Sequence, residues 1–319
     1  MRKIIAFLLS VSLLACLFCG CSGTTVSNKK YSVVTTVFPE YEWTKEIIGD
    51  RITDFDLTML IDSGVDLHSF QPTASDMLKI SNCDLFIYIG GESDKWVEDA
   101  IEQADNDKMI TLNLLEVLGK NAKSEETVEG MQAEEEEEEE AYDEHVWLSL
   151  KNAALFCEKI KDALAQIDAE NASVYDTNCK QYTDKINDLD VQYKSAADGA
   201  KTKTLLFCDR FPFRYLTDDY GLSYYAAFSG CSAESEASFE TVDFLANKVK
   251  ELSLNSVIVL ESSDKKIANT VIKESGKSDV AVLSLDSMQS ATQKDVGDGA
   301  TYLSVMQKNL EVLKKALGE

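Results

Sequence analysis

The 319-residue chain has little histidine and lacks several motifs of common enzyme classes. It contains two histidines, no phosphate-cradling GxxxxGK[ST] or GxGxxG motif, and no GxSxG nucleophile elbow. Basic residues are also scarce, with 31 Lys and Arg against 56 Asp and Glu, for a net charge of −25. Nucleic acid and anionic membrane surfaces would repel such a chain. These absences exclude nucleic acid as a partner and favour a cationic ligand.

Long apolar segments are absent after residue 30. At the start, Arg2 and Lys3 precede an apolar run of about 15 residues, shorter than the roughly 20 that span a bilayer. The run ends at Cys19-Gly20-Cys21. This pattern predicts a lipoprotein signal peptide over residues 1–20, lipid on Cys21 and a tether over 21–30. An ordinary cleaved signal with an incidental cysteine is the alternative. We expect an extracytoplasmic protein, lipid-anchored to the cell membrane.

Five cysteines follow Cys21, so at least one thiol is unpaired. Two antiparallel helices on either side of a turn near Asp168 could bring Cys157 and Cys179 together as a disulfide. Cys208 and Cys231 could be bridged to each other or buried. An exported protein can keep such bonds, but the sequence does not decide between these arrangements.

Short apolar, β-rich runs alternate with helical stretches along both halves of the chain, which predicts βαβ units and parallel sheets. The expected strands cover residues 31–37, 53–60, 83–90, 109–114, 204–208, 223–228, 255–260 and 280–285. Between the halves, apolar residues recur at spacings of three and four through two helices. The second helix is long enough to connect two domains.

These patterns divide the chain into an N-terminal α/β lobe over 31–169, a connecting helix over 170–199 and a C-terminal α/β lobe over 200–319. Residues 120–142 are polar and acidic, and we expect a mobile loop there. Its glutamate run, Glu134–Glu140, is either a solvated spacer or a means of concentrating cations near a binding cleft.

Potential metal ligands follow several predicted strands, where parallel sheets usually bind ligands. These residues are His68, Asp209, Glu261 and Asp286, and His145 begins the helical region after the acidic loop. Imidazole and carboxylate ligands suit zinc, manganese and iron. A strand-terminal aspartate can instead be a turn former or helix cap. The residues alone leave metal-assisted hydrolysis open, although we expect no enzyme activity.

Eight ordered stretches resemble the metal-receptor lipoproteins of bacterial ABC importers for zinc and manganese. They read VVTTVFPEYEWTKEIIGD, VDLHSFQPTASDM, DEHVWLSLKNA, DAENASVYDTNCKQY, FCDRFPFRYLTDDYGL, VIVLES, VLSLDSM and TYLSVMQKNLEVL. The resemblance implies two similar lobes, each a parallel four-stranded sheet flanked by helices, joined by one long rigid helix, with one metal ion bound between the lobes.

Carried over by position, the resemblance implies a metal site made of His68, His145, Asp209 and Asp286. Asp209 lies at, or one residue after, the position of the third histidine of zinc receptors, and in another register Cys208 replaces that histidine. Direct ligation of the metal by Cys208 or Cys231 is a further alternative. Glu261 would support the site. A set of two histidines and two carboxylates leaves the choice between Zn²⁺ and Mn²⁺ open, with zinc slightly favoured.

The function that the resemblance implies is capture of Zn²⁺ or Mn²⁺ outside the membrane and delivery to the permease of an ABC importer. We expect a monomer that supplies no energy itself, since it has no phosphate-binding motif. The alternative is a surface-anchored adhesin or interaction protein in which the metal is structural.

Overall fold

The structure is a computed structural model that describes residues 29–132, 141–232 and 236–318. The predicted signal peptide, Cys21 and Glu134–Glu140 lie outside the described residues. Eight strands form two sheets of four, and the paired strands are parallel. The N-terminal sheet has the order β2-β1-β3-β4 and the C-terminal sheet the order β6-β5-β7-β8. The predicted α/β fold with two parallel four-stranded sheets is therefore confirmed.

The strands lie where the apolar runs predict them. They are β1 (Tyr31–Thr35), β2 (Phe55–Met59), β3 (Leu85–Tyr88), β4 (Ile110–Asn113), β5 (Thr204–Arg210), β6 (Ser223–Phe228), β7 (Ser256–Leu260) and β8 (Ala281–Leu285). Most residues of β3 and all of β7 are buried. Burial on both faces explains why these strands are continuously apolar rather than alternating.

The α-helices connect and cover the strands. They are α2 (Phe38–Ile48), α3 (Ala74–Ser81), α4 (Trp96–Glu102), α5 (Leu114–Leu118), α6 (Leu150–Ile167), α7 (Ala172–Gly199), α8 (Arg214–Tyr220), α9 (Phe239–Glu251), α10 (Lys266–Ser275), α11 (Gln293–Gly297) and α12 (Tyr302–Ala316). Short 3₁₀ helices are η1 (Gly49–Asp54), η2 (Leu67–Ser69), η3 (Glu92–Asp94), η4 (Gly119–Asn121), η5 (Val146–Leu148) and η6 (Ala169–Asn171). Polar caps fix several starts: Ser149, for example, accepts a hydrogen bond from Asn152 N at the start of α6.

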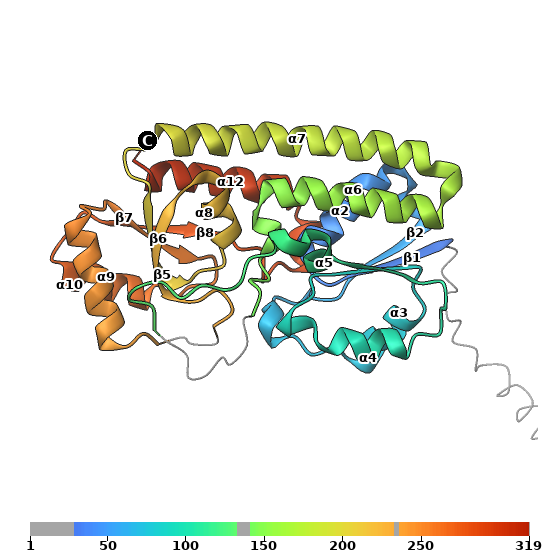
Figure 1. Ribbon diagram of the computed structural model, residues 1–319, viewed down its shortest axis with the longest axis horizontal. Coiled ribbons are helices and arrows are strands. Elements are labelled where there is room, and N and C mark those ends of the chain that lie inside the picture. Colours follow the sequence, from blue (N-terminus) through green and yellow to red (C-terminus); the bar gives the residue numbers. More distant parts are fainter. Residues whose placement is uncertain (1–28, 133–140, 233–235, 319) are drawn as a thin grey trace, which may run out of the picture.

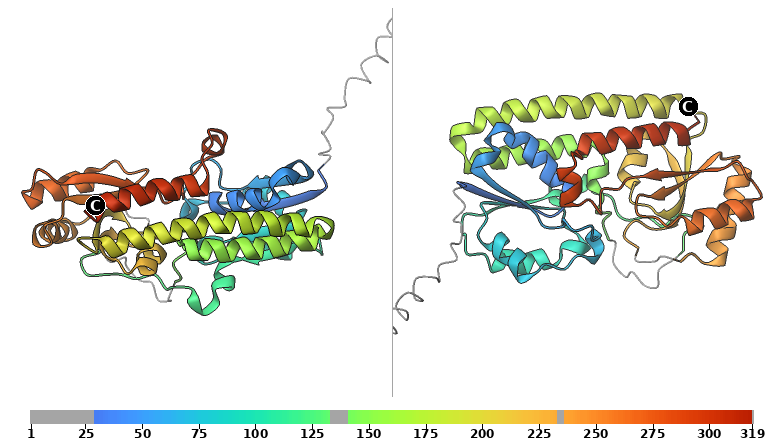
Figure 2. Two further views of the ribbon diagram at one scale, coloured as in Figure 1. Left: turned by 90° about the horizontal axis from the view of Figure 1, so that it is seen from above. Right: turned by 180° about the vertical axis from the view of Figure 1, so that it is seen from behind.

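Helix α7 runs along both lobes, with α6 and α12 packed beside it (Figure 1). The view from above in Figure 2 shows the lobes side by side along this helix. Its buried face includes Tyr175, Cys179, Ile186 and Tyr193, at helical spacing. No helix in the described part of the chain is both long and apolar enough to cross a membrane.

Neither disulfide that the sequence left open is formed, and the first of them is Cys157–Cys179. Helices α6 and α7 do pack together, but both thiols are free. Cys179 Sγ lies 3.5 Å from Glu158 Oε1 instead. Cys208 and Cys231 are also free thiols, so the fold is held by packing and hydrogen bonds.

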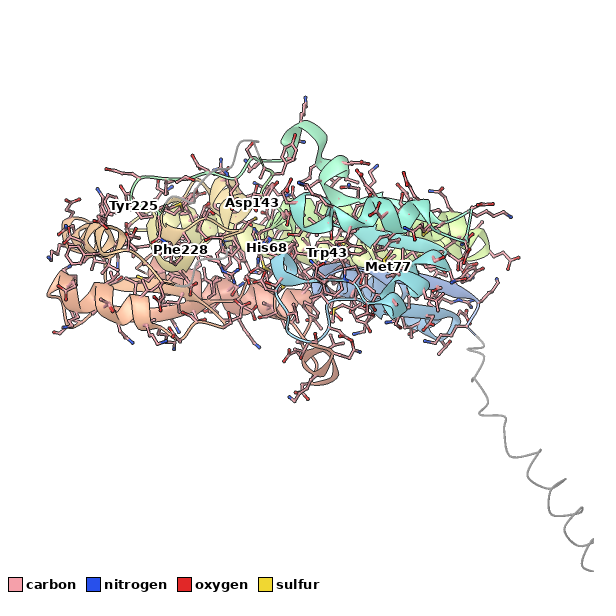
Figure 3. The ribbon with its side chains drawn as sticks, turned by 90° about the horizontal axis from the view of Figure 1, so that it is seen from below. Trp43, His68, Met77, Asp143, Tyr225 and Phe228 are labelled. Atoms are coloured by element: carbon pink, nitrogen blue, oxygen red, sulfur yellow. The ribbon has the colours of Figure 1, made fainter. Side chains whose placement is uncertain are left out.

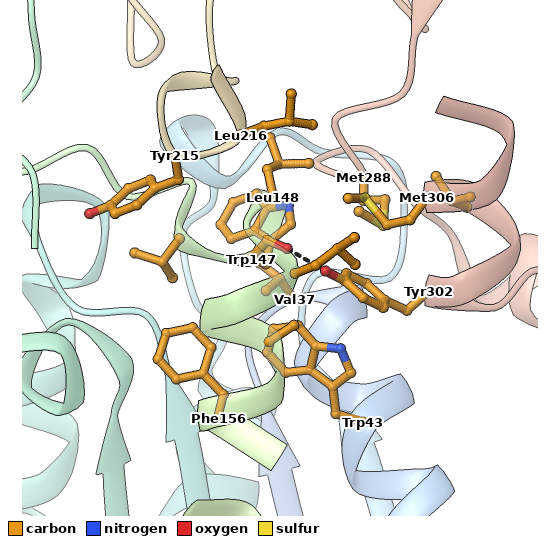
Figure 4. Packing of buried hydrophobic residues seen from close by; sticks show 14 of the residues in the cluster. Val37, Trp43, Trp147, Leu148, Phe156, Tyr215, Leu216, Met288, Tyr302 and Met306 are labelled. Carbon is orange, nitrogen blue, oxygen red and sulfur yellow. Dashed lines mark hydrogen bonds between the residues drawn. The ribbon is translucent and has the colours of Figure 1, made fainter. Parts of the chain in front are cut away.

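One apolar core spans both lobes at the level where they meet (Figure 4). Trp147, from the N-terminal lobe, donates its indole N–H to Ser287 O of the C-terminal lobe over 2.8 Å. Tyr302 of α12 donates its hydroxyl to Trp147 O over 2.7 Å, and its ring meets that of Trp43 edge-on at 5.2 Å. Because buried polar groups are paired across this boundary, the lobes are joined by packing as well as by α7.

The first, described part of the predicted loop over 120–142 makes specific contacts with the C-terminal lobe. Glu126 accepts hydrogen bonds from Arg214 and Tyr224, and Gln132 N donates to Ala227 O over 3.0 Å. Gln132 Oε1 also accepts from Ser238 N over 2.7 Å. Polar residues that look featureless in sequence thus find partners on the C-terminal lobe. We call residues 123–132 the strap, because this segment crosses from one lobe to the other.

Candidate metal site

His68 lies in the loop between β2 and α3, at the boundary between the lobes (Figure 3). Asp66 begins the one-turn helix η2 and accepts a hydrogen bond from His68 N over 3.1 Å. The other oxygen of Asp66 accepts from Arg210, at the end of β5, over 2.8 Å. The backbone around His68 is therefore fixed by a contact between the two lobes.

His145 directly precedes η5 and is fully buried. Its Nδ1 lies 2.9 Å from Asp143 Oδ1, which also accepts from His145 N over 2.9 Å. A carboxylate at Nδ1 favours the tautomer with the proton on that nitrogen. The lone pair of His145 is then on Nε2.

The ring of His68 is held in a similar way. Its Nδ1 lies 2.8 Å from Ser93 Oγ and 3.4 Å from Glu144 Oε2. Burial lowers the pKa of His68 to about 3; the neighbouring His145 and Arg210 act in the same direction, and Asp66 acts against them. His68 is therefore neutral at physiological pH, as a metal ligand must be.

The Nε2 atoms of His68 and His145 face each other at 3.2 Å. Anchoring each ring through Nδ1 leaves Nε2 free to ligate, an arrangement typical of zinc-binding histidines. The side-chain nitrogen of Gln289 contacts His145 Nε2 and lies 3.5 Å from His68 Nε2. The structure thus brings the two predicted histidines together with a third polar side chain from the C-terminal lobe.

Cys231 completes a group of potential ligands. The ligand atoms of His68, His145 and Cys231 all lie within 4.8 Å of one another. In the described residues, this is the one place where three or more His, Cys, Asp or Glu side chains lie close enough together to hold a metal ion. Cys231 follows β6 by a short turn. The group joins two residues of the N-terminal lobe to one of the C-terminal lobe.

Asp209 and Cys208 are not in this group. Asp209 Oδ1 accepts from Arg210 N over 2.9 Å, and Oδ2 accepts from Leu260 N over 3.3 Å. Both residues line a neighbouring pocket of about 470 Å³ that Asp66 also borders. Cys208 is buried. The backbone contacts of Asp209 turn its carboxylate to the ends of β5 and β7.

Asp286 and Glu261 lie on another side of the loop that carries Gln289. Asp286 Oδ1 accepts from Met288 N over 2.8 Å, and burial and the nearby Glu261 raise the pKa of Asp286 to about 6. Glu261 accepts from Ser287 N over 2.9 Å and from Ser287 Oγ over 2.8 Å. Glu261 thus supports the loop that places Gln289 against the histidines. The described geometry does not bring Asp209 or Asp286 to the histidine pair. Their role as ligands remains a prediction.

Gln289 had no place in the site predicted from sequence, and Cys231 had only a minor one. The rule that ligands lie beyond strand ends could have found Cys231, because it follows Phe228, the last residue of β6, by three positions. Gln289 carries no such signal. Its approach depends on Met288, whose φ of +62° turns the chain in a way that few residues other than glycine adopt.

The sequence matches the family described as "ZnuA: Zinc-uptake complex component A periplasmic" over residues 33–316. The zinc-binding lipoprotein AdcA of Streptococcus pneumoniae is 32% identical over 316 residues, covering 99% of this chain and 61% of that protein. The high-affinity zinc uptake system protein ZnuA of Bacillus subtilis is 31% identical, covering 98% of this chain and 96% of that protein.

Among solved structures, the Zn(II)-bound ZnuA-like domain of S. pneumoniae AdcA matches with a TM-score of 0.71 and 30% identity. The alignment covers 91% of this chain and all of that domain. The chain spans about six-tenths of the full length of the AdcA protein. The chain therefore belongs to the ZnuA family, whose members are solute-binding proteins rather than enzymes.

Proposed function

We propose that this protein is an extracytoplasmic receptor that binds Zn²⁺ between its lobes and delivers it to the permease of an ABC importer. The observation that carries the proposal is the pair of Nε2 atoms 3.2 Å apart, on rings whose Nδ1 atoms are held by Asp143 and Ser93. Lipid on Cys21 would tether the receptor to the membrane, and the receptor acts as a monomer.

Zinc is the metal that these observations favour. Two neutral imidazoles suit zinc better than manganese, which prefers oxygen ligands. The similar proteins named above are described as zinc-binding or as zinc uptake proteins, and the similar domain is described as Zn(II)-bound. The same similarities give less support to the alternative of a surface adhesin in which the metal is structural.

Competitive titration of the purified, metal-free protein with Zn²⁺ and Mn²⁺ against a chromophoric chelator tests the proposal. We expect one equivalent of zinc, bound more tightly than manganese. His68→Ala and His145→Ala should each weaken zinc binding by more than the roughly 10- to 100-fold that losing a supporting residue costs. Equal affinity of both variants and the unaltered protein would overturn the proposed site.

Asp209→Asn and Asp286→Asn belong in the same series. If they weaken zinc binding as strongly as the histidine variants do, the predicted set of two histidines and two aspartates is the ligand set. A smaller effect agrees with the described geometry, in which both carboxylates accept backbone hydrogen bonds.

Delivery and anchoring need cellular measurements. A deletion strain should grow poorly when zinc is chelated and recover with the intact gene, whereas a His68→Ala gene should not restore growth. Cys21→Ala should release the protein from the membrane fraction. Growth that stays normal without the gene under zinc limitation contradicts the proposed role in uptake.

A further inference from the structure

The group of potential ligands contains a sulfur atom as well as the two imidazoles. Cys231 Sγ lies within 4.8 Å of the ligand atoms of both His68 and His145. Atoms bound to a tetrahedral zinc lie roughly 3.4 to 3.8 Å apart, given Zn–N and Zn–S bonds of about 2.1 and 2.3 Å. Small side-chain shifts would therefore bring the three atoms to bonding distance of one ion.

The backbone before Cys231 is shaped to approach His145. A Cβ atom on Gly230 would lie 3.0 Å from His145 Cε1 and 2.9 Å from Phe211 O. These separations are too short for a side chain, so glycine permits the turn after β6 to lie directly against the imidazole. The next side chain, Cys231, is thereby placed beside the histidines.

The strap holds the other side of this turn. Glu125 Oε1 accepts a hydrogen bond from Cys231 N over 2.8 Å. Glu125 N in turn donates to Ala141 O over 2.8 Å, and Asp143 N donates to Lys123 O over 2.8 Å. The segment that positions Cys231 is thus paired with the segment that leads into His145.

A buried carboxylate lies on the Nδ1 side of the His68 ring. Glu144 is 1% exposed, and its Oε2 has no hydrogen-bond partner among the described residues. That oxygen lies 3.4 Å from His68 Nδ1. A buried carboxylate oxygen without a hydrogen bond is costly, and a metal ion on Nε2 would offset part of this cost by making the Nδ1–H of His68 a stronger donor towards it.

We propose that Cys231 is the third protein ligand of the metal, so that the site is made of His68, His145 and Cys231 rather than of two histidines with Asp209. The inference rests on the proposed function as a metal receptor. On binding, an Sγ–metal bond forms as the Sγ–H bond breaks, and the proton passes to solvent. A thiolate ligand is soft and selects zinc over manganese.

Cobalt(II) absorption spectroscopy tests the inference on the purified protein. Loading with Co²⁺ should produce the near-ultraviolet charge-transfer band of a thiolate ligand. Cys231→Ser should lose this band while His68 and His145 still hold Co²⁺ with weaker affinity. Cys208→Ser is the matched control, since that buried thiol lies beside the site but outside the ligand group, and its variant should keep the band.

Selectivity provides a second measurement. Cys231→Asp should weaken zinc binding more than manganese binding, and the ratio of the two affinities should fall at least about 10-fold, because oxygen ligands favour manganese. Far-ultraviolet circular dichroism establishes that each variant is folded. A cobalt complex without the band, or a band that survives Cys231→Ser, would overturn the inference. Absence of any metal binding would instead contradict the proposed function.

Discussion

Arg210 of the C-terminal lobe donates to Asp66 of the N-terminal lobe over 2.8 Å, two residues before the metal-binding candidate His68. Both side chains are about four-fifths buried, at 20% and 21% exposure, so this ion pair is screened little by solvent. Although burial alone would raise the pKa of Asp66, the charge of Arg210 and the hydrogen bonds from Arg210 and His68 N lower it. The Arg210–Asp66 pair holds the two lobes together, and both of its charges influence the pKa of His68.

Replacing Arg210 with leucine should raise the pKa of His68. The guanidinium disfavours the protonated imidazole, and without it Asp66 also stands unopposed as a negative neighbour. The increase should appear as a higher midpoint of the His68 titration in the metal-free variant, measured by NMR. Arg51→Leu, which removes a partly exposed pair with Asp54 at the opposite end of β2 from His68, should leave the His68 titration unchanged.

Asp143→Asn should weaken zinc binding by roughly 10- to 100-fold, because Asp143 orients His145 and increases its basicity. Competition with a chromophoric chelator measures this change. Asp105→Asn, at an exposed position, removes the same charge away from the site and should have no measurable effect. Equal losses in both variants would mean that net charge, rather than the contact with His145, governs affinity.

Gln289→Glu should increase zinc affinity by about 10-fold or more, since a carboxylate is a better metal ligand than an amide. The amide of Gln289 contacts both imidazoles in the described structure, and a carboxylate cannot donate to them. The variant should therefore favour the metal-bound form. Gln181→Glu, exposed on α7, is the control for added charge. Weaker zinc binding in Gln289→Glu would show that the side chain does not reach the metal.

Asp94→Asn should stabilise the protein at neutral pH. Burial and the nearby Glu144 raise the pKa of Asp94 from 3.8 to about 7. Between these values the unfolded state holds fewer protons than the folded state, so the free energy of unfolding falls as pH rises from about 4 to 7. Asparagine removes this penalty, and its carbonyl can still accept from Gly90 N.

Urea denaturation of the metal-free protein at several pH values measures this effect. The stabilisation should be on the order of a few kcal/mol above pH 7 and disappear near pH 4. Asp99→Asn, at an exposed position on α4, should follow the unaltered protein at every pH. A constant difference across the pH range would mean that the gain comes from packing rather than from the ionisation of Asp94.

The apolar runs were sufficient to predict the eight described strands and the long helix. The signal is continuous in β3 and β7, which are buried on both faces. The strand-end rule placed His68 near the cleft, and His145 was placed there by its position directly after the acidic loop. It also selected Asp209 and Asp286, whose oxygens accept backbone N–H groups instead. Which way a side chain turns after a strand depends on the local turn, such as the close packing of Gly230 on His145, and hydrophobic periodicity carries no information on that.

The contacts of the strap with the C-terminal lobe could not be predicted from the sequence either. Glu125 and Glu126 look like ordinary members of a solvated acidic segment, yet they meet Cys231 N and Arg214 on the other lobe. Charge complementarity between segments about 100 residues apart emerges only when the fold brings them together.

The core around Trp147 and Tyr302 has a consequence for how the molecule melts. The largest buried cluster contains residues of both sheets, although each lobe also has a smaller cluster of its own. Loss of one lobe therefore exposes apolar surface of the other. Calorimetry should therefore record a single cooperative transition rather than two. A metal ion held between the lobes should raise the melting temperature of that transition as the metal concentration increases. Metal binding would then stabilise both lobes together rather than one of them.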